Sequence, residues 1–502
     1  MSDDRGRRGI LLVAATTLLL ALPFLGTLPL FDPDEGYYPA CAAESLRHGH
    51  PLDPTLNGEP RWNKPPLSYA LMQGAFFVLG TNEFAARLPS VVAGAALVAI
   101  LGLATARAAG GRAGIVAAAV LASSLGFQVM TRAAHPEMAL VLGTAAAQAL
   151  LALWFVAPAG ERPGWAWWAA GLAMGFGFLA KGPSTLAMPA LMLAAGMLVV
   201  PREGRPSWGE AGRAFGGAAA LALAVAAPWF LWMGAKHGDA FWRVAFGQME
   251  HLTEERHEGF RESPLFFVPV LAGAFLPWVL FLPSALRGLR RSDPSPGARF
   301  TLLMALAAGT SFLFWSLSAS KNPHYALVFL PPLAAVVGAW IAPAPAGEPA
   351  WFRRARFLAA TALAPALLVA AAVGLRSVAE SLVVPPHREM ARRILRTEGR
   401  ERAPVAVYRL RLPSLSFYLD REVPRVPEPG ALREFLDGPG VRFLVTRSRD
   451  WMALPEGRAS DLAFDDSSGN RLLRFEPAPS PPPPARGGVP PGGAPPPGGG
   501  PR

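Results

Sequence analysis

Cysteine is almost absent from this chain of 502 residues, in which Cys41 is the only one. A lone cysteine excludes an intrachain disulfide and leaves a cysteine-based zinc site without partners. Charged residues are scarce too, at 17% of the chain against roughly 25% in soluble domains. The abundant apolar residues come in blocks about 20 residues long, a length that matches a bilayer. An ordinary soluble protein is therefore excluded.

Lysine is also rare in this chain. Only four of the 47 basic residues are lysines, namely Lys64, Lys181, Lys236 and Lys321. The net charge of +11 lies in short loops between the apolar blocks, and this distribution excludes a nucleic-acid-binding surface.

Eleven apolar blocks predict membrane spans and hence an α-helical polytopic membrane protein, with 11 to 13 spans as the range. The segment 66–80 is short for a span, so we interpret it as an interfacial helix on the outer surface. The first block lacks a cleavage site and is interpreted as an uncleaved anchor. The predicted spans are 10–30, 84–106, 113–131, 138–158, 165–181, 183–200, 214–235, 264–286, 300–319, 324–342 and 357–375.

Arginines in the short loops predict the orientation of these spans. They gather in loops on the side of the N-terminus, for example at Arg107, Arg205 and Arg290, and such loops are cytoplasmic. Everything after residue 375 is then outside, and so are all four lysines. Cations are disfavoured on that side, so their presence there indicates an anionic ligand, for which phosphate is the natural candidate.

Ionisable side chains are nearly missing from the interiors of the spans. An ion-coupled carrier usually needs one near the midplane, so this class is disfavoured. No glycine-rich nucleotide-binding motif follows a predicted strand. The charges gather at span ends, which indicates chemistry at the outer membrane boundary.

The first outer loop, 31–83, is the longest between spans and is rich in polar motifs. Asp34 and Glu35 follow the first span, where carboxylates either cap a helix or take part in chemistry on an acceptor hydroxyl or a cation. Lys64 precedes two prolines near Arg61 and Tyr69. It either binds a phosphate or marks the interface by snorkelling.

Two further outer segments add polar groups. Arg132, His135 and Glu137 precede a span, where they bind a ligand or cap a helix. In the loop 236–263, His251 and His257 have only weak metal-ligand spacing, and a solvated amphipathic loop is the favoured interpretation.

The region 376–476 has the composition of a small soluble α/β domain, external by the predicted topology. Short β-like runs at 405–410, 415–419 and 441–446 alternate with a helical stretch at 387–400. The segment 477–502 is rich in proline and glycine and is predicted to be disordered. The multispan unit would then cover residues 1–375.

The polar motifs together resemble the bacterial GT-C glycosyltransferases of the protein O-mannosyltransferase / lipid A aminoarabinose transferase group (glycosyltransferase family 39) over about 30–450. The motifs K-P-P-L and K-G-P in this order are fairly specific for the group. The residues that carry the resemblance are Asp34, Glu35, Tyr37–Tyr38, Gly49, Pro54, Leu56–Gly58, Lys64–Leu67, Tyr69, Arg87–Ser90, Arg132–Glu137, 178–183, Pro277–Trp278, 321–325 and 413–419.

The resemblance implies inverting transfer of a sugar from a polyprenyl (undecaprenyl) phosphate carrier to an extracytoplasmic acceptor, either lipid A or another envelope glycolipid. Asp34 would be the catalytic carboxylate, with Glu35 beside it, and Lys64 would bind the carrier phosphate. The implied substrate-binding residues are Arg61, Lys64, Tyr69, Arg132, Glu137, Lys181, Lys321, His324 and Tyr325.

One departure from the group concerns a metal. Where the aminoarabinose transferases tend to have an acidic residue before K-P-P-L, this chain has Asn63, so a divalent metal is only weakly supported, with His257 as a weak candidate ligand. No cofactor is firmly implied. Two alternatives stay open at this point: transfer to proteins, as in protein O-mannosyltransferases, and a non-enzymatic lipid-carrier transporter or flippase.

Overall fold

The computed structural model describes residues 2–254, 263–289, 293–319, 321–342, 387–398, 402–453, 459–465 and 469–476. Three predictions lie outside the described residues: the span 357–375, the tail 477–502 and the candidate ligand His257.

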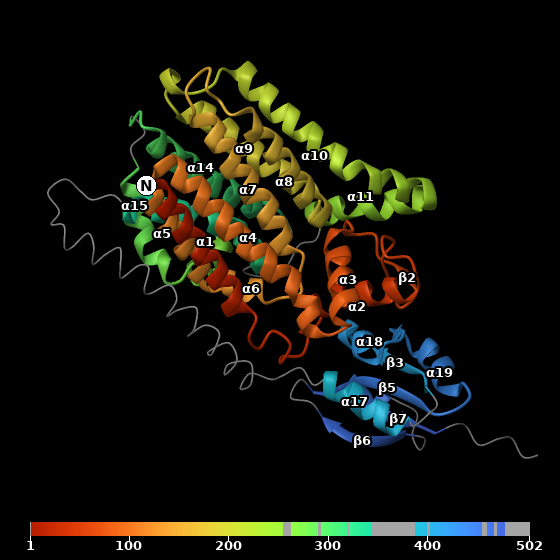
Figure 1. Ribbon diagram of the computed structural model, residues 1–502. Helices are drawn as coiled ribbons and strands as arrows, with labels where there is room; N and C mark the ends of the chain where they lie inside the picture. Colours follow the sequence, from red (N-terminus) through yellow and green to blue (C-terminus); the bar gives the residue numbers. More distant parts are fainter. Residues whose placement is uncertain are drawn as a thin grey trace, which may run out of the picture.

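Helices make up most of the described chain before residue 343 (Figure 1). Their shared core is rich in alanine, which lets helix backbones approach closely. The helices of this bundle are α1 (Ser2–Ala21), α4 (Glu83–Ala109), α5 (Gly111–Ser123), α6 (Leu125–Thr131), α7 (Glu137–Val156), α8 (Gly164–Lys181), α9 (Ser184–Val199), η1 (Arg202–Gly204), α10 (Trp208–His237), α11 (Asp239–Glu254), α12 (Phe267–Ala274), η3 (Trp278–Phe281), α13 (Leu282–Arg287), α14 (Pro296–Leu317), η4 (Pro323–Phe329) and α15 (Leu330–Ile341).

Five helical segments in the described part of the chain are long and apolar enough to cross a membrane, and seven are if each of two bent pairs forms one span. α9 and α3 (Leu67–Leu79) are apolar but shorter. The prediction of a polytopic helical membrane protein is therefore confirmed, whereas the total of eleven spans stays a prediction.

The two bent pairs meet at their breaks. The predicted span 113–131 bends by 67° between α5 and α6, and the predicted span 264–286 bends by 109° after α12. At the breaks Leu125 N donates to Leu276 O at 3.1 Å, and Trp278 Nε1 donates to Ser123 Oγ at 2.9 Å. Each break thus provides hydrogen-bond partners for polar groups at the other break. Such partners are needed because the interior of a bilayer contains no water to bind these groups.

Three local predictions were wrong. The first helix ends at Ala21 rather than near residue 30, because turns and bends follow it through Leu28, with Phe24 at a φ of 64°. The segment after Gly238 forms helix α11 rather than a loop. The run 415–419 lies in a helix, α18 (Pro413–Leu419), where proline in the first turn favours a helical start.

The first predicted outer loop contains α2 (Asp34–Arg47), a two-stranded hairpin of β1 (Thr55–Leu56) and β2 (Glu59–Pro60), and α3. Asn57 and Gly58 form the turn of the hairpin, with positive φ angles of 55° and 76°. Asn-Gly is a preferred pair in two-residue hairpin turns, because both residues adopt positive φ angles readily. Both backbone N–H groups donate to the carboxylate of Glu44, at 2.7 and 3.0 Å. In Figure 1 this layer lies between the helix bundle and the C-terminal sheet.

The C-terminal region has a five-stranded sheet in the order β4-β3-β5-β7-β6, with helices beside it (Figure 1). β3 pairs in parallel with β4 and β5, and the other pairs are antiparallel. Asn57 ties the first loop to this region, since its Oδ1 accepts hydrogen bonds from Val423 N and Ser416 Oγ. The elements are α17 (His387–Thr397), β3 (Val405–Tyr408), α18, β4 (Arg425–Val426), α19 (Pro429–Asp437), β5 (Arg442–Arg447), η5 (Ser448–Ala453), β6 (Ala459–Asp465) and β7 (Asn470–Phe475).

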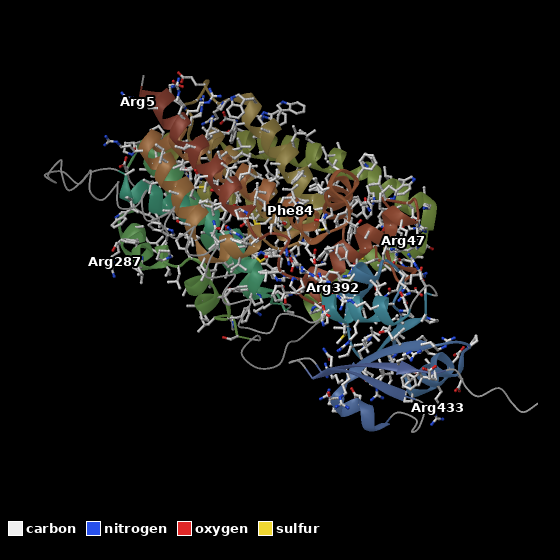
Figure 2. All side chains as sticks on the ribbon, turned by 60° about the horizontal axis from the view of Figure 1, so that its bottom comes forward. Arg5, Arg47, Phe84, Arg287, Arg392 and Arg433 are labelled. Atoms are coloured by element: carbon white, nitrogen blue, oxygen red, sulfur yellow. The ribbon has the colours of Figure 1, made fainter. Side chains whose placement is uncertain are left out.

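The labelled arginines of Figure 2 mark the two ends of the molecule. Arg5 and Arg287 lie toward the end of the helix bundle away from the sheet. Arg392 lies at the junction with the sheet, and Arg433 lies beside the sheet itself.

Candidate active site

Four helix ends bring the candidate site together. Helices α7 and α8 are antiparallel neighbours, so the first residue of α7, Glu137, lies beside the last residue of α8, Lys181. The helices approach closely because Gly143 faces Gly177: a Cβ on Gly143 would lie 2.7 Å from Gly177 Cα. The start of α2 and the start of η4 complete the site with Asp34 and His324.

Glu137 is the centre of the charged contacts. Its side chain is only 1% exposed and forms an ion pair with Lys181. Its Oε1 lies 3.2 Å from His324 Nε2, and its Oε2 contacts His135 Nδ1. A buried carboxylate needs such partners, because an isolated charge in a low-dielectric interior is costly.

Asp34 completes what we call the helix-end cluster, which comprises Asp34, His135, Glu137, Lys181 and His324. One carboxylate oxygen of Asp34 and one ring nitrogen of each histidine lie within 4.8 Å of one another. Asp34 is exposed while the other members are buried or partly buried, so it is the member that an incoming molecule meets first.

Lys64 and Arg61 add positive charge next to the cluster. Lys64 interacts electrostatically with His135 and Lys181. Burial, and then the neighbouring Arg61 guanidinium, lower the pKa of Lys64 to about 8. Arg61 also lies over the ring of Tyr37, 4.0 Å from its centroid. The excess of cations favours an anionic ligand.

Aromatic rings surround the cluster. The rings of Tyr69 and Tyr38 are 5.8 Å apart, and Tyr38 meets His135 edge-on at 5.1 Å. Lys181 Nζ lies 4.3 Å from the ring centroid of Tyr325. Such faces hold a cation in place while leaving it available to an anion.

Glu35 has a separate set of partners, although it follows Asp34 directly. Its two oxygens accept hydrogen bonds from Arg87 at 2.7 and 2.9 Å, from Ala134 N at 2.9 Å and from Phe31 N at 3.1 Å. Desolvation raises the pKa of Glu35, but Arg87 and the N–H groups of Ala134 and Phe31 together lower it more, so the net pKa is below the ordinary value. Glu35 therefore holds the segment before α2 in place.

Three basic residues have partners outside the cluster. Arg132 donates to Gln128 O at 3.1 Å and to Leu20 O at 2.8 Å. Lys321 donates to Ser318 O at 2.7 Å. Lys236 pairs with Asp53 at 2.8 Å, and Asp53 also accepts from Trp62 Nε1 at 2.7 Å. The sequence predicted that all four lysines lie on the outer side. In the structure Lys64 and Lys181 lie at the cluster, whereas Lys236 and Lys321 have contacts elsewhere.

A second group with metal-ligand chemistry contains Glu44, His48 and Glu422. Glu44 already accepts two backbone hydrogen bonds from the hairpin turn, and His48 and Glu422 are exposed. This group is therefore the weaker candidate for a metal.

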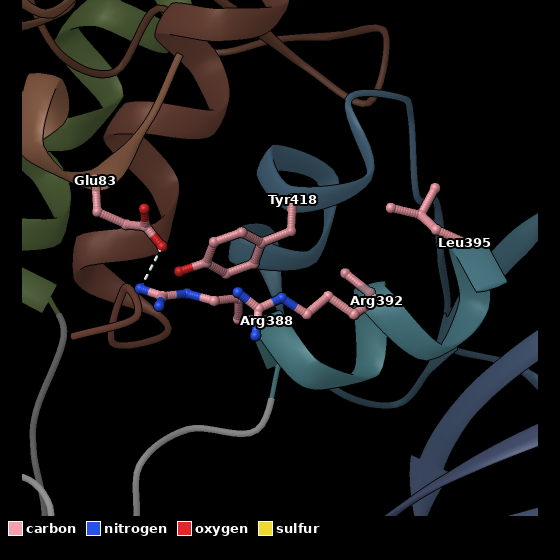
Figure 3. Close-up of a pocket in the computed structure, with 6 residues that line it drawn as sticks. Glu83, Arg388, Arg392, Leu395 and Tyr418 are labelled. Atoms are coloured by element: carbon pink, nitrogen blue, oxygen red, sulfur yellow. Dashed lines mark ion pairs between the residues drawn. The ribbon is translucent and has the colours of Figure 1, made fainter. Parts of the chain in front are cut away.

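A separate pocket of about 250 Å³ lies where α17 and α18 meet the start of α4 (Figure 3). Arg388 Nη2 lies 2.5 Å from Glu83 Oε1, and Arg388 Nη1 donates to Thr27 O at 3.1 Å. Arg392, Leu395 and Tyr418 complete its walls. These contacts join the C-terminal sheet region to the helix bundle.

Comparisons with known proteins find related sequences. Residues 63–232 match the family described as dolichyl-phosphate-mannose-protein mannosyltransferase. The chain is 32% identical over 340 residues to the undecaprenyl phosphate-α-4-amino-4-deoxy-L-arabinose arabinosyl transferase of Pseudomonas paraeruginosa, covering 67% of this chain and 60% of that protein. It is 33% identical to the protein of the same name from Pseudomonas aeruginosa, covering 65% and 58%.

The chain is similar in sequence to the ArnT-like proteins of the GT-C group. Its fold is that of ArnT from Cupriavidus metallidurans in the crystal structure bound to undecaprenyl phosphate, with a TM-score of 0.73, 21% identity and coverage of 92% of this chain and 97% of that one. The sequence match spans about 60% of the length of the Pseudomonas relatives. These relatives and the apolar helices identify a multi-pass protein of a bacterial inner membrane.

The sequence predicts no specific role for two residues of the candidate site. It places His135 in a polar turn and Tyr38 in a motif. His135 is one of eight histidines and precedes a proline at a helix start, which was the available signal. Its contact with His324 cannot be derived from spacing, because 189 positions separate them.

Proposed function

We propose that this protein is an inverting glycosyltransferase. It moves a sugar from an undecaprenyl phosphate carrier to an extracytoplasmic acceptor, which is lipid A or another envelope glycolipid. The observation that carries the proposal is the helix-end cluster, where an exposed carboxylate, Asp34, lies near the buried cation Lys181 at the ends of membrane helices. The names of the Pseudomonas relatives support the donor and the reaction class.

In this reaction the leaving group is the carrier phosphate, which needs positive charge as the sugar bond breaks. Lys64 and Lys181 supply it, with Arg61 as an additional contact. Glu137 holds Lys181 in position through their ion pair. Such preorganised charges cost no reorganisation during the reaction.

Asp34 acts on the acceptor. A hydroxyl acceptor would lose its proton to the Asp34 carboxylate as it attacks the anomeric carbon. A phosphate acceptor needs no base, and Asp34 would then orient it or stabilise positive charge on the sugar. Glu35 is a positioning residue, because its bonds to Arg87 and Ala134 fix the segment that presents Asp34.

The test is transfer by the purified protein in detergent. Undecaprenyl phosphate with a labelled sugar is incubated with lipid A in one arm and with a mixture of envelope proteins in another. We expect label in the lipid fraction. Label in the protein arm alone would replace this proposal by protein O-mannosylation, a function that the family description favours. Label that crosses a vesicle membrane without transfer would identify a flippase.

The orientation is part of the same proposal. The N-terminus is cytoplasmic, and the cluster and the region 376–476 are extracytoplasmic. Arg5 and Arg287 lie toward the end of the bundle opposite the sheet (Figure 2), as positive-inside loops would. The natural cysteine, Cys41, is buried, so Arg433→Cys in whole cells gives a specific test. We expect labelling of Cys-substituted residue 433 by an impermeant maleimide; labelling only after lysis would reverse the topology.

A further inference from the structure

We propose that Asp34, His135 and His324 form a binding site for one divalent transition-metal ion. Each contributes one donor atom, and the three atoms lie within 4.8 Å of one another. Two imidazoles and one carboxylate form a ligand set that suits zinc and its neighbours in the first transition row. This site does not include Asn63 or His257, the two positions that the family resemblance relates to a metal.

The ligands come from three separate elements. Asp34 begins α2, His135 lies in the turn before α7, and His324 lies in η4. Donor atoms on a tetrahedral zinc ion are about 3.3 Å apart, so closing the site needs side-chain shifts of about 1–1.5 Å. The rings of His135 and His324 already lie 4.9 Å apart, and exposed Asp34 is free to rotate toward them.

Glu137 provides a carboxylate next to both histidine ligands. A metal-binding histidine usually gives the N–H of its other ring nitrogen to a carboxylate, which fixes the ring. Glu137 contacts Nδ1 of His135 and lies 3.2 Å from Nε2 of His324. A proton on Nδ1 of His135 leaves the lone pair of Nε2 available to a metal.

His135 and Glu137 lie next to each other in the interior. His135 is 9% exposed, and its Nδ1 contacts Glu137 Oε2 without the geometry of a hydrogen bond.

The charges at the site are two carboxylates and two lysines. Asp34 and Glu137 carry two negative charges, and Lys181 and the neighbouring Lys64 carry two positive charges. A bound dication would leave the site positive, with free coordination positions on the side of exposed Asp34. An anionic ligand such as a phosphate ester would fill those positions. The site goes beyond the proposed reaction, and its occupancy is measured without any sugar donor.

The test is zinc binding by the untagged, full-length protein in detergent after treatment with a chelator. We expect about one Zn²⁺ per chain by elemental analysis and by titration. His324→Gln and His135→Gln should each weaken binding at least tenfold. The matched control is His48→Gln, which alters the second histidine–carboxylate group and should bind as the wild type does.

Two results would overturn the inference: less than about 0.2 zinc per chain in the wild type at micromolar free zinc, or equal affinity in the wild type and His324→Gln. If a variant fails to fold, X-ray absorption of the zinc-loaded wild type decides the matter. Two imidazole ligands and one carboxylate are expected there, and a site with fewer than two imidazoles contradicts the assignment.

Discussion

Arg87 Nε donates to Glu35 Oε1 at 2.7 Å, and Arg87 Nη2 donates to Glu35 Oε2 at 2.9 Å. This buried pair separates the roles of two adjacent carboxylates, of which the family resemblance names Asp34 as the catalytic one. Since both oxygens of Glu35 are occupied by protein donors, Asp34 is the carboxylate left for chemistry.

The first prediction concerns stability. Glu35→Gln removes the charge that balances Arg87 in a buried position, and breaking a buried pair costs about 3–5 kcal/mol. We expect the midpoint of thermal unfolding in detergent to fall by several degrees. Asp34→Asn is the control, and its midpoint should match the wild type. Equal midpoints for the wild type and Glu35→Gln would remove the structural role of this pair.

The second prediction separates folding from activity. Asp34→Asn keeps the size of the side chain but removes its charge, so we expect transfer to fall by at least 100-fold, since general base catalysis contributes about 10²–10⁴-fold. Labelled product formed from undecaprenyl-phosphate-linked sugar is the readout. Activity within threefold of the wild type would exclude Asp34 from the mechanism.

The third prediction concerns Lys64 and pH. Because burial and Arg61 lower the pKa of Lys64 to about 8, a growing share of the unliganded protein loses this charge above pH 8. Affinity for undecaprenyl phosphate should therefore fall between pH 8 and 9.5. Lys64→Arg keeps its charge over this range and should show a flatter profile. A wild-type affinity that does not change up to pH 9.5 contradicts a role in phosphate binding.

The fourth prediction concerns Asp53, which joins the first loop to the end of α10 through Lys236 and His237, at 2.8 and 2.7 Å. Desolvation raises the pKa of Asp53, but the contacts with Lys236, Trp62 and His237 together lower it more. Its stabilising effect is thus complete above the ordinary value of 3.8 and is lost at lower pH. Asp53→Asn should reduce unfolding free energy by about 1–2 kcal/mol at pH 7, and the difference should shrink below pH 4.

The fifth prediction concerns the contact between α7 and α8. A Cβ at Gly143 would lie 2.5 Å from Ala173 O, so Gly143→Ala should separate the helices at a cost of about 1–3 kcal/mol. We expect lower thermal stability. Gly209→Ala is the control, because the nearest atom to its added Cβ is the flexible end of Arg213, at 3.6 Å. Equal losses in the two variants would argue against close packing at Gly143.

The sequence alone determined the class of the protein and the positions of its helices. Apolar blocks of bilayer length are local features, so they predicted α4, α7 and α14 within a few residues. The turn chemistry of Asn57–Gly58 is local as well. Local patterns failed where a break depends on a distant partner, as at Ser123 and Trp278, and at 415–419, where helix α18 packs on α2.

Tertiary structure alone decided which polar residues meet. Lys64 and Lys181 lie near one cluster while Lys236 and Lys321 do not, because each contact depends on which helix ends are neighbours in the bundle. Asp34 and Glu35 differ for the same reason: successive residues on a helix point in different directions, so one faces Arg87 and the other stays exposed. The sequence supplied the charged groups, and helix packing placed Asp34 among the two histidines, Glu137 and Lys181.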